Sequence, residues 1–304
     1  MRALVFGVAA ALVWALPATA WSAPIAVVRG PADENHATAA WNRAGTVEYV
    51  AFTRRDPDTD RRSAILRLIR SDGSFRSVRL NTRGDGDAGG FFHSRRVLYS
   101  EKRGSDYDLR VYDITTGRRS APTSVNTRKS EWLASRSGPY LLFNRDNGAA
   151  NRVVLHDLRD GTDTRLARSP DQDAFAGQVS GNWAVWMNCA AVCDVYRRDI
   201  AAGTTSILPR PAGEPEANQY EPSVTRDGTV YLVRNTGGAC TSTVELVRFA
   251  ATDPAEGTVV AQLPPGRFTT GTYARQNPGG SVDLFFARGS CDTFRHNVFK
   301  LRSP

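Results

Sequence analysis

Six polar side chains close or follow apolar runs at comparable points along the chain, and five of them are arginines. They are Arg54, Arg103, Arg145, Asn188, Arg234 and Arg288. A guanidinium group presents a rigid fork of N–H donors that fits the paired oxygens of a carboxylate, sulfate or phosphate. If the fold brings these residues to one face, they could bind an anionic ligand. The alternative is that each arginine is solvated or pairs with a neighbouring acid such as Asp56, Glu101 or Asp146.

The first twenty residues have the features of a secretory signal peptide. Arg2 gives a basic start, residues 3–16 are almost wholly apolar, and Ala18-Thr19-Ala20 is a small-x-small cleavage site. The sequence therefore predicts cleavage after Ala20 and an exported mature chain, residues 21–304, that is secreted or associated with the cell envelope. No second long apolar stretch follows, so we expect no transmembrane anchor in the mature chain.

The mature chain is basic, but its charge pattern is not that of a nucleic-acid-binding protein. Loss of Arg2 reduces the 39 basic residues to 38 against 31 acidic ones, a net charge of +7. There is no basic helix, aromatic-basic motif or zinc-finger spacing. The scattered basic residues predict a solvated surface, and weak attraction to an anionic glycan or cell-wall polymer is the alternative.

All four cysteines fall in the C-terminal half, and an even number in an exported chain predicts disulfides. Cys189 and Cys193 span one tight turn and can pair with each other. Cys240 and Cys291 occupy the equivalent turn in the next two repeats, so they could link neighbouring repeats. A zinc site is the rival interpretation, but no histidine accompanies the cysteines in sequence. Disulfides are therefore favoured.

These residues belong to a repeat of about 45 residues. In the typical copy an apolar run ends in charge, a polar turn follows, and a second run closes on Asp-x-x-x-Gly, although the first and fifth copies lack this ending. The clearest copies end at Asp113 and Gly117, Asp157 and Gly161, and Asp199 and Gly203. The apolar runs lie at 47–52, 97–100, 140–143, 183–187, 229–233 and 282–286. Their near-continuous apolar character predicts strands that are buried on both faces.

The repeat predicts an all-β, six-bladed β-propeller of four-stranded blades in a single domain, residues 21–304. In the fifth unit the strands are expected near 219–225, 229–234, 243–249 and 258–263, with Asp227-Gly228 in a hairpin turn. The last unit is one strand short. Residues 25–29 can supply that strand and close the ring, which removes its free edges.

Two segments resemble the blades of TolB-like propellers. Residues 221–232 (EPSVTRDGTVYL) match a blade opening, and residues 98–113 (LYSEKRGSDYDLRVYD) match the rest of a blade. The resemblance covers nearly all of the mature chain in degenerate form. It implies a six-bladed propeller fold, and because the shared motifs are structural it assigns no catalytic residue to this chain.

In a propeller, the turn after the second strand and the connection between blades share one face, where the six polar residues named first would gather. The leading hypothesis is a non-catalytic binding or protein-interaction scaffold, with a protein, an anionic glycan or a cell-wall polymer as partner and no nucleic acid. The four histidines, His36, His93, His156 and His296, stand singly, and there is no Gly-x-Ser-x-Gly. We therefore assign no catalytic residue, metal site or cofactor.

The alternative function is a hydrolase or lyase acting on a carbohydrate or lactone. Glu131, Asp173 and Glu221 each precede or begin an innermost strand, so two of them could form a carboxylate pair at the channel mouth. Asp85 and Asp87 in the Gly-rich segment 83–90 could supply oxygen ligands to Ca²⁺. A flexible loop is the favoured interpretation of that segment.

Overall fold

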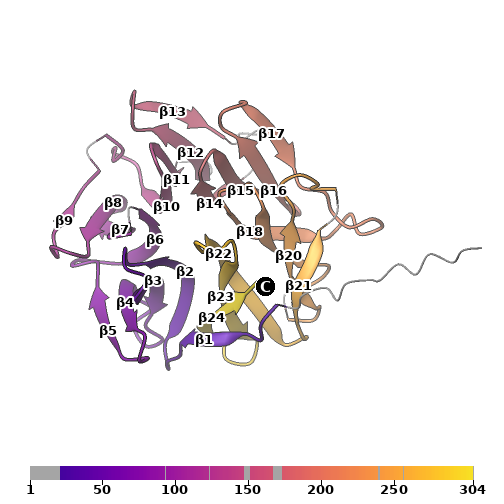
Figure 1. Ribbon diagram of the computed structural model, residues 1–304, viewed down its shortest axis with the longest axis horizontal. Helices are drawn as coiled ribbons and strands as arrows, with labels where there is room; N and C mark the ends of the chain where they lie inside the picture. The colour runs from indigo at the N-terminus through magenta and orange to yellow at the C-terminus, as the bar shows by residue number, and fades with distance from the viewer. Residues whose placement is uncertain are drawn as a thin grey trace, which may run out of the picture.

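The computed structural model describes residues 21–303 apart from 93, 123, 147–150, 167–172, 239 and 256. In this part of the chain 24 strands form six four-stranded antiparallel sheets around a central axis (Figure 1). The fold is therefore the predicted all-β, six-bladed propeller. No helix here has the length and apolar character needed to cross a bilayer. The predicted signal peptide, residues 1–20, lies outside the described residues.

Five blades take their strands in chain order from the axis outward. Blade 1 has β2 (Asp33–Trp41), β3 (Val47–Arg55), β4 (Arg62–Arg70) and β5 (Phe75–Arg79); blade 2 has β6 (Gly86–Phe92), β7 (Arg96–Arg103), β8 (Asp106–Asp113) and β9 (Arg119–Ser120); blade 3 has β10 (Glu131–Ser137), β11 (Tyr140–Asp146), β12 (Asn151–Asp157) and β13 (Thr162–Arg165). Blade 4 has β14 (Asp173–Ser180), β15 (Trp183–Cys189), β16 (Cys193–Asp199) and β17 (Thr204–Ile207); blade 5 has β18 (Asn218–Val224), β19 (Val230–Asn235), β20 (Val244–Phe249) and β21 (Thr258–Leu263). The strands of blade 5 lie within one residue of the predicted bounds.

Blade 6 combines both ends of the described chain. It contains β22 (Arg267–Gln276), β23 (Val282–Ser290) and β24 (His296–Arg302), and β1 (Ile25–Val28) is its outermost strand. Ile25 pairs with Lys300 and Val28 with Val298 in an antiparallel ladder. The prediction that an N-terminal strand closes the ring is confirmed.

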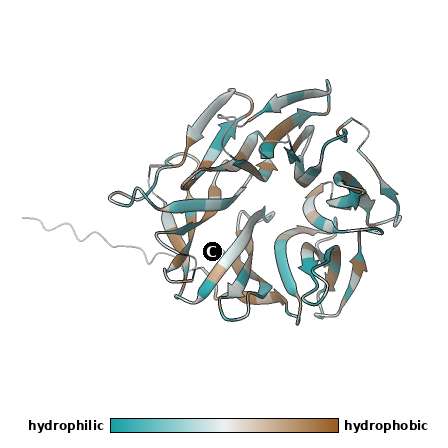
Figure 2. Cartoon of the chain, turned by 180° about the vertical axis from the view of Figure 1, so that it is seen from behind, coloured by the Kyte–Doolittle hydropathy of each residue, from teal (hydrophilic) through white to brown (hydrophobic). Residues whose placement is uncertain are grey.

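The core consists of apolar layers between adjacent blades. Between blades 5 and 6, Tyr231 and Leu246 pack with Leu284 and Phe286, and all four side chains are buried. Apolar segments concentrate in the middle strands of the blades, whereas the innermost strands and the loops are mostly hydrophilic (Figure 2). The second strand of each blade is apolar on both faces because it contacts a neighbouring blade on each side.

The seam between blades 6 and 1 also contains a buried network of charges. Arg275 of β22 donates hydrogen bonds to Glu48 of β3, at 2.6 Å, and to Asp283 of β23. Lys300 contacts both Glu48 oxygens at 3.0 Å, and Arg302 Nε donates to Asp283 Oδ1 at 2.6 Å. Burial would raise the pKa of Asp283, but its bonds to Arg302 and Arg275 outweigh burial and hold the pKa below the usual value. The network therefore ties the last blade to the first.

Both predicted disulfides are present. Cys189 pairs with Cys193 across the turn between β15 and β16, and Cys240 pairs with Cys291, linking blade 5 to blade 6. The described residues contain no free cysteine. Backbone bonds from Gly266 N to Cys240 O and from Cys291 N to Gly266 O, both 3.0 Å, join the same three segments.

The two disulfides should contribute unequally to stability. Their sequence separations are 51 and 4 residues, and the entropy that a cross-link removes from the unfolded chain grows with loop length. We expect Cys240→Ser/Cys291→Ser to lower the free energy of unfolding by about 4 kcal/mol and Cys189→Ser/Cys193→Ser by about 2 kcal/mol. Urea unfolding at neutral pH measures both. A larger loss from the second pair would contradict the expectation.

The prediction of a flexible loop for residues 83–90 is wrong for its second half, which begins strand β6 at Gly86. The glycines meet a packing requirement, because a Cβ on Gly89 would lie 2.6 Å from the carbonyl oxygen of Ala134 in blade 3. Asp85 Oδ1 accepts a hydrogen bond from Arg62 N at 3.0 Å, and the Asp87 carboxylate forms an ion pair with the Arg62 guanidinium at 3.3 Å. Both acids thus contact blade 1.

Candidate functional site

A β-bulge interrupts every innermost strand where the six strands surround the axis. The pairing register shifts between residues 35 and 38, 88 and 91, 132 and 135, 176 and 179, 220 and 223, and 270 and 272. A bulge bends its strand and re-aims the side chain of the extra residue. The six bulges therefore determine what lines the central channel.

The residues at these bulges alternate between glycine and a residue with a side chain. In blade order they are His36, Gly89, Leu133, Gly177, Glu221 and Gly271. The three with side chains adopt positive φ angles of 49°, 47° and 53°, which L-residues rarely adopt. The surrounding ring must hold them in this conformation, as is common where strain serves a functional site.

The glycines are required by the close approach of the next blade. A Cβ on Gly177 would lie 2.5 Å from Pro222 O in blade 5 and 2.8 Å from Val185 O in its own blade. A Cβ on Gly271 would lie 3.2 Å from His36 Cα in blade 1. Each glycine therefore accommodates the bulge of the blade that follows it.

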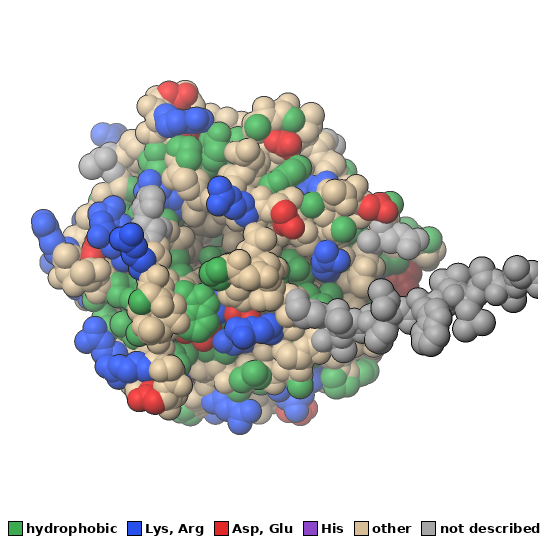
Figure 3. All heavy atoms as spheres, viewed as in Figure 1, with side chains coloured by type: hydrophobic (Ala, Val, Ile, Leu, Met, Phe, Trp, Pro, Cys, Tyr) green, Lys and Arg blue, Asp and Glu red, His purple; other side chains and the backbone are tan. Residues whose placement is uncertain are grey.

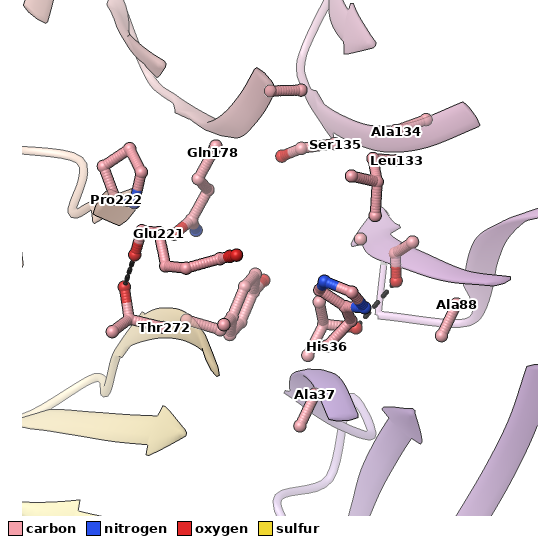
Figure 4. A pocket seen from close by; sticks show the side chains of 17 residues that line it. His36, Ala37, Ala88, Leu133, Ala134, Ser135, Gln178, Glu221, Pro222 and Thr272 are labelled. Carbon is pink, nitrogen blue, oxygen red and sulfur yellow. Dashed lines mark hydrogen bonds between the residues drawn. The ribbon is translucent and has the colours of Figure 1, made fainter. Parts of the chain in front are cut away.

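The bulges surround a narrow cavity of about 60 Å³ at the centre of the ring. The Glu221 carboxylate and the His36 imidazole point into it from different sides, and Leu133 lies across from them (Figure 4). At one end of the cavity, the side chain of Gln178 links blade 4 to blades 5 and 6. Its Oε1 accepts a hydrogen bond from Val224 N, and its Nε2 donates one to Ala274 O, each at 3.2 Å. This cavity is much smaller than a typical ligand pocket of 300–1,000 Å³.

A wider cavity of about 680 Å³ opens where the innermost strands end and turn into the second strands. Its lining combines aromatic rings, amides and guanidinium groups, including Trp41, Phe91, Phe92, Tyr273, Asn277, Arg226 and Arg275. Trp41 Nε1 donates to Asn277 Oδ1 at 3.3 Å, and the Arg275 guanidinium carbon lies 4.6 Å from the centre of the Trp41 ring. These contacts hold the rim in place. We call this the wide cavity.

Four of the five predicted ligand arginines contact carboxylates of their own blades. Arg54 lies 3.2 Å from Glu34, Arg103 lies 3.7 Å from Asp108, and Arg234 lies 2.7 Å from Glu245. Arg145 lies 3.0 Å from Glu131 and 2.6 Å from Asp163. On the face shown in Figure 3, Lys and Arg side chains are scattered in small groups with uncharged groups between them.

The remaining two predicted residues have different surroundings. Asn188 is buried in β15, and neither atom of its side-chain amide has a hydrogen-bond partner among the described residues. Arg288 lies on β23 with its guanidinium carbon 3.8 Å from the centre of the Phe299 ring. The six residues line neither cavity at the axis as a group, and their role in ligand binding stays a prediction.

The three candidate catalytic carboxylates are not brought together. Glu131 is buried and accepts hydrogen bonds from Thr127 Oγ1 at 2.6 Å and Arg145 Nε at 3.0 Å. Asp173 is exposed and accepts a bond from Asn151 N at 3.1 Å. Of the three, Glu221 alone lines the channel. Among the described residues no group of three or more His, Cys, Asp or Glu side chains is placed to hold a metal ion.

Two of the single histidines pair with aspartates. His156 Nδ1 lies 2.7 Å from Asp163 Oδ1, and His296 Nδ1 lies 2.5 Å from Asp33 Oδ1 across the seam between blades 6 and 1. Burial would raise the pKa of Asp33, but hydrogen bonding and charge attraction from His296 outweigh burial and lower it. His93 lies outside the described residues.

The sequence interpretation missed the wide cavity and the position of His36. Trp41 and Arg275 are 234 positions apart, so no local pattern joins them. The bulges did leave a signal, because Gly89, Leu133, Gly177 and Glu221 follow one another at intervals of 44 residues. An alignment of the repeats on that interval would have placed Glu221 in the channel.

No protein-family model matches the sequence, and no curated protein matches it. Solved structures do match the fold. TolB from Acinetobacter baumannii has a TM-score of 0.56 at 16% identity, and the match covers 85% of this chain and 64% of that one. A candidate TolB from Agrobacterium tumefaciens has a TM-score of 0.59 at 12% identity, with 90% and 92% covered. A protein of unknown function from Dyadobacter fermentans has a TM-score of 0.62 at 9% identity, with 94% and 99% covered.

At these identities the likeness establishes the fold alone, a six-bladed propeller similar to TolB propellers. This chain spans less than two thirds of the A. baumannii TolB. A role must therefore be argued from the cavities and side chains of this chain.

Proposed function

We propose that this chain is an exported, non-catalytic propeller that binds a partner or ligand at the wide cavity. The observation that carries the proposal is the contrast between the two cavities. The channel, where Glu221 and His36 point, holds about 60 Å³, whereas the wide cavity holds about 680 Å³ and has an aromatic and polar lining. Ligand-binding sites typically have a volume and a lining like those of the wide cavity.

Export is the second part of the proposal. The N-terminal 20 residues have the pattern of a signal peptide, and both disulfides are consistent with an oxidising, extracytoplasmic compartment. Expression with the leader in a bacterium that exports proteins should yield a product that starts at Trp21. N-terminal sequencing of the exported protein checks this, and an uncleaved product in the cytoplasm would contradict it.

The binding role is tested by blocking the wide cavity. Gln276 is an exposed residue at the cavity rim, so Gln276→Trp should fill part of the volume without disturbing a buried contact. We expect short glucan or chitin oligosaccharides, or members of a peptide library, to raise the melting temperature of the unaltered protein, since a ligand of the folded state stabilises it. The shift should vanish in Gln276→Trp and persist in the control Arg76→Trp on outer strand β5.

The alternative, a hydrolase or lyase, is favoured by one observation, the two titratable side chains that face the channel. We expect no product from aryl glycosides or lactones above the level of a Glu221→Gln control, because the channel is too small to enclose a sugar ring. Chromogenic release and lactone hydrolysis measure this. Turnover that Glu221→Gln abolishes would overturn the non-catalytic proposal.

A further inference from the structure

Three arginines of blade 6 lie together, and none of them pairs with a carboxylate in the part of the chain that the structure describes. Arg29 follows β1, Arg288 lies on β23 and Arg267 begins β22. Among the described residues no ion pair joins any of the three to an acid, in contrast to the other four predicted ligand arginines. We call Arg29, Arg267 and Arg288 the arginine row.

The strand register places the row on one face of the sheet. Arg288 is paired with Thr269 on β22 and with Asn297 on β24. Val28 pairs with Val298, so Arg29 comes next beside Asn297. Arg267 lies two residues before Thr269, and side chains two apart along a strand share a face. Strands two apart in a sheet are about 10 Å from each other, which is the expected spacing of Arg29 and Arg288.

This arrangement does not serve stability. Like charges close together on one face of a sheet repel, and among the described residues no ion pair to an acid offsets the repulsion of these three. Burial, together with the positive charges of Arg267 and Arg29, lowers the pKa of Arg288. The two nearest acids along the chain are engaged elsewhere, because Asp292 accepts a hydrogen bond from Ser290 Oγ at 3.4 Å within its own turn and Asp33 pairs with His296. An anion bound at the row would relieve the repulsion.

The row crosses blade 6 at the end where β22 begins and β23 ends, and its members are anchored there. The Arg288 guanidinium stacks on Phe299, and the Cys240–Cys291 disulfide with its two backbone bonds fixes Gly266, directly before Arg267. At the same end of the blade, the turn after β23 presents Phe294, whose side chain is 68% exposed and contacts Phe268. Phe268 lies between Arg267 and Thr269 along β22, so its side chain and Phe294 belong to the opposite face of the sheet, and the face of the row presents the Asn297 amide beside the guanidinium groups.

We propose that the arginine row binds an anionic polysaccharide, with the guanidinium groups holding its carboxylate or sulfate oxygens and the Asn297 amide contacting its hydroxyl groups. Charge complementarity selects the anion, because a row of arginines forms paired hydrogen bonds with such groups. The neutral Asn297 amide beside the charged groups favours a polymer that carries hydroxyl groups as well as anions, and an acidic peptide is the alternative outcome of the test. The inference rests on the proposed binding function and adds a second site, on blade 6 and away from the wide cavity.

The test compares two double variants with the same net charge. Arg29→Gln/Arg267→Gln removes two exposed members of the row, and Arg76→Gln/Arg79→Gln removes two exposed arginines of β5 that also have no ion pair among the described residues. Binding to polygalacturonate and to heparin is measured by affinity electrophoresis and calorimetry. Each charge-assisted contact is expected to contribute about tenfold in affinity. The first double variant should therefore lose at least tenfold, and the control should match the unaltered protein.

A third variant and a third ligand complete the test. Arg288→Gln should weaken binding similarly, and circular dichroism checks that this half-buried substitution leaves the blade folded. Equal losses in both double variants would show only nonspecific charge attraction and would overturn the proposal. Binding of polyglutamate with the same dependence on the row, and of neither polysaccharide, would assign the row to an acidic peptide instead.

The test also separates this site from the wide cavity. Gln276→Trp should bind polygalacturonate or heparin as the unaltered protein does, because the row lies on another part of blade 6. If neither polysaccharide binds but ligands of the wide cavity do, the row proposal fails and the binding function stands. Loss of polysaccharide binding in Gln276→Trp would place the anion site at the wide cavity and overturn the assignment to the row.

Discussion

Replacing Gly177 with alanine is expected to lower the free energy of unfolding by about 3 kcal/mol or more. The new Cβ would lie 2.5 Å from Pro222 O and 2.8 Å from Val185 O. Both atoms belong to backbone, so relief requires blade 5 to move away from blade 4 and β14 to move away from β15, near the axis where every innermost strand is confined. Urea unfolding at neutral pH measures the loss. Gly89→Ala should behave alike, because its Cβ would meet Ala134 O at 2.6 Å.

A matched control is Gly279→Ala in the turn between β22 and β23. No atom lies within 4 Å of the Cβ that alanine would add there, and the backbone of Gly279 is not in the left-handed region. We expect this variant to unfold at the same urea concentration as the unaltered protein. If Gly177→Ala were equally stable, the inner strands would have more freedom than the bulge geometry allows.

The second large effect is expected from Asp283→Asn in the seam between blades 6 and 1. Asp283 is 0% exposed and accepts hydrogen bonds from both Arg275 and Arg302. Loss of its charge leaves the buried Arg275 with Glu48 as its remaining acidic partner, and breaking a buried pair typically costs about 3–5 kcal/mol. The change in unfolding free energy at pH 7 measures this. Arg159→Gln, in an exposed pair with Asp157, should leave stability unchanged.

The same carboxylate should give the protein an acid-sensitive seam. The pKa of Asp283 is lower in the folded protein than the value of about 4 for an unfolded chain. The contribution of the Asp283 charge to the free energy of unfolding is therefore complete above pH 4 and is lost as the pH falls through the pKa of the folded protein. The pKa of Asp33 is also lowered in the folded protein, so protonation of Asp33 at low pH should reduce stability as well. The loss of stability between pH 5 and 2 should be smaller in Asp283→Asn, and an identical loss would contradict this assignment.

The architecture could be predicted because each blade carries its own local signals. Asp227-Gly228 marks a hairpin, and the strand that follows is apolar on both faces, so the turn signals and the runs between them located β18 to β21 within one residue. The disulfide partners followed from equivalent turns. Ring closure by β1 followed from a missing strand. These features depend on residues close together in the chain or on equivalent positions of the repeat.

The candidate sites depend on relations that the repeat does not encode. Arg54 and Arg288 occupy similar places after apolar runs, yet Arg54 contacts Glu34 of its own blade and Arg288 has Arg29 and Arg267 as neighbours. The difference arises at the paired position of the innermost strand, where Glu34 lies opposite Arg54 and Thr269 lies opposite Arg288, and Arg29 is added by the chain that follows β1. The Gly-rich segment 83–90 was misassigned for a similar reason, since the atom that requires glycine belongs to Ala134 in the next blade.

The alternation of glycine and larger residues at the six bulges also limits how this ring could be rebuilt. A glycine at blades 2, 4 and 6 accommodates the bulge of blades 3, 5 and 1. Deleting or inserting a single blade would place two residues of the same kind next to each other, leaving either a void or a collision at the axis. The smallest unit that can be exchanged is therefore a pair of blades. Engineered rings with four or eight blades should assemble from this sequence more readily than rings with five or seven.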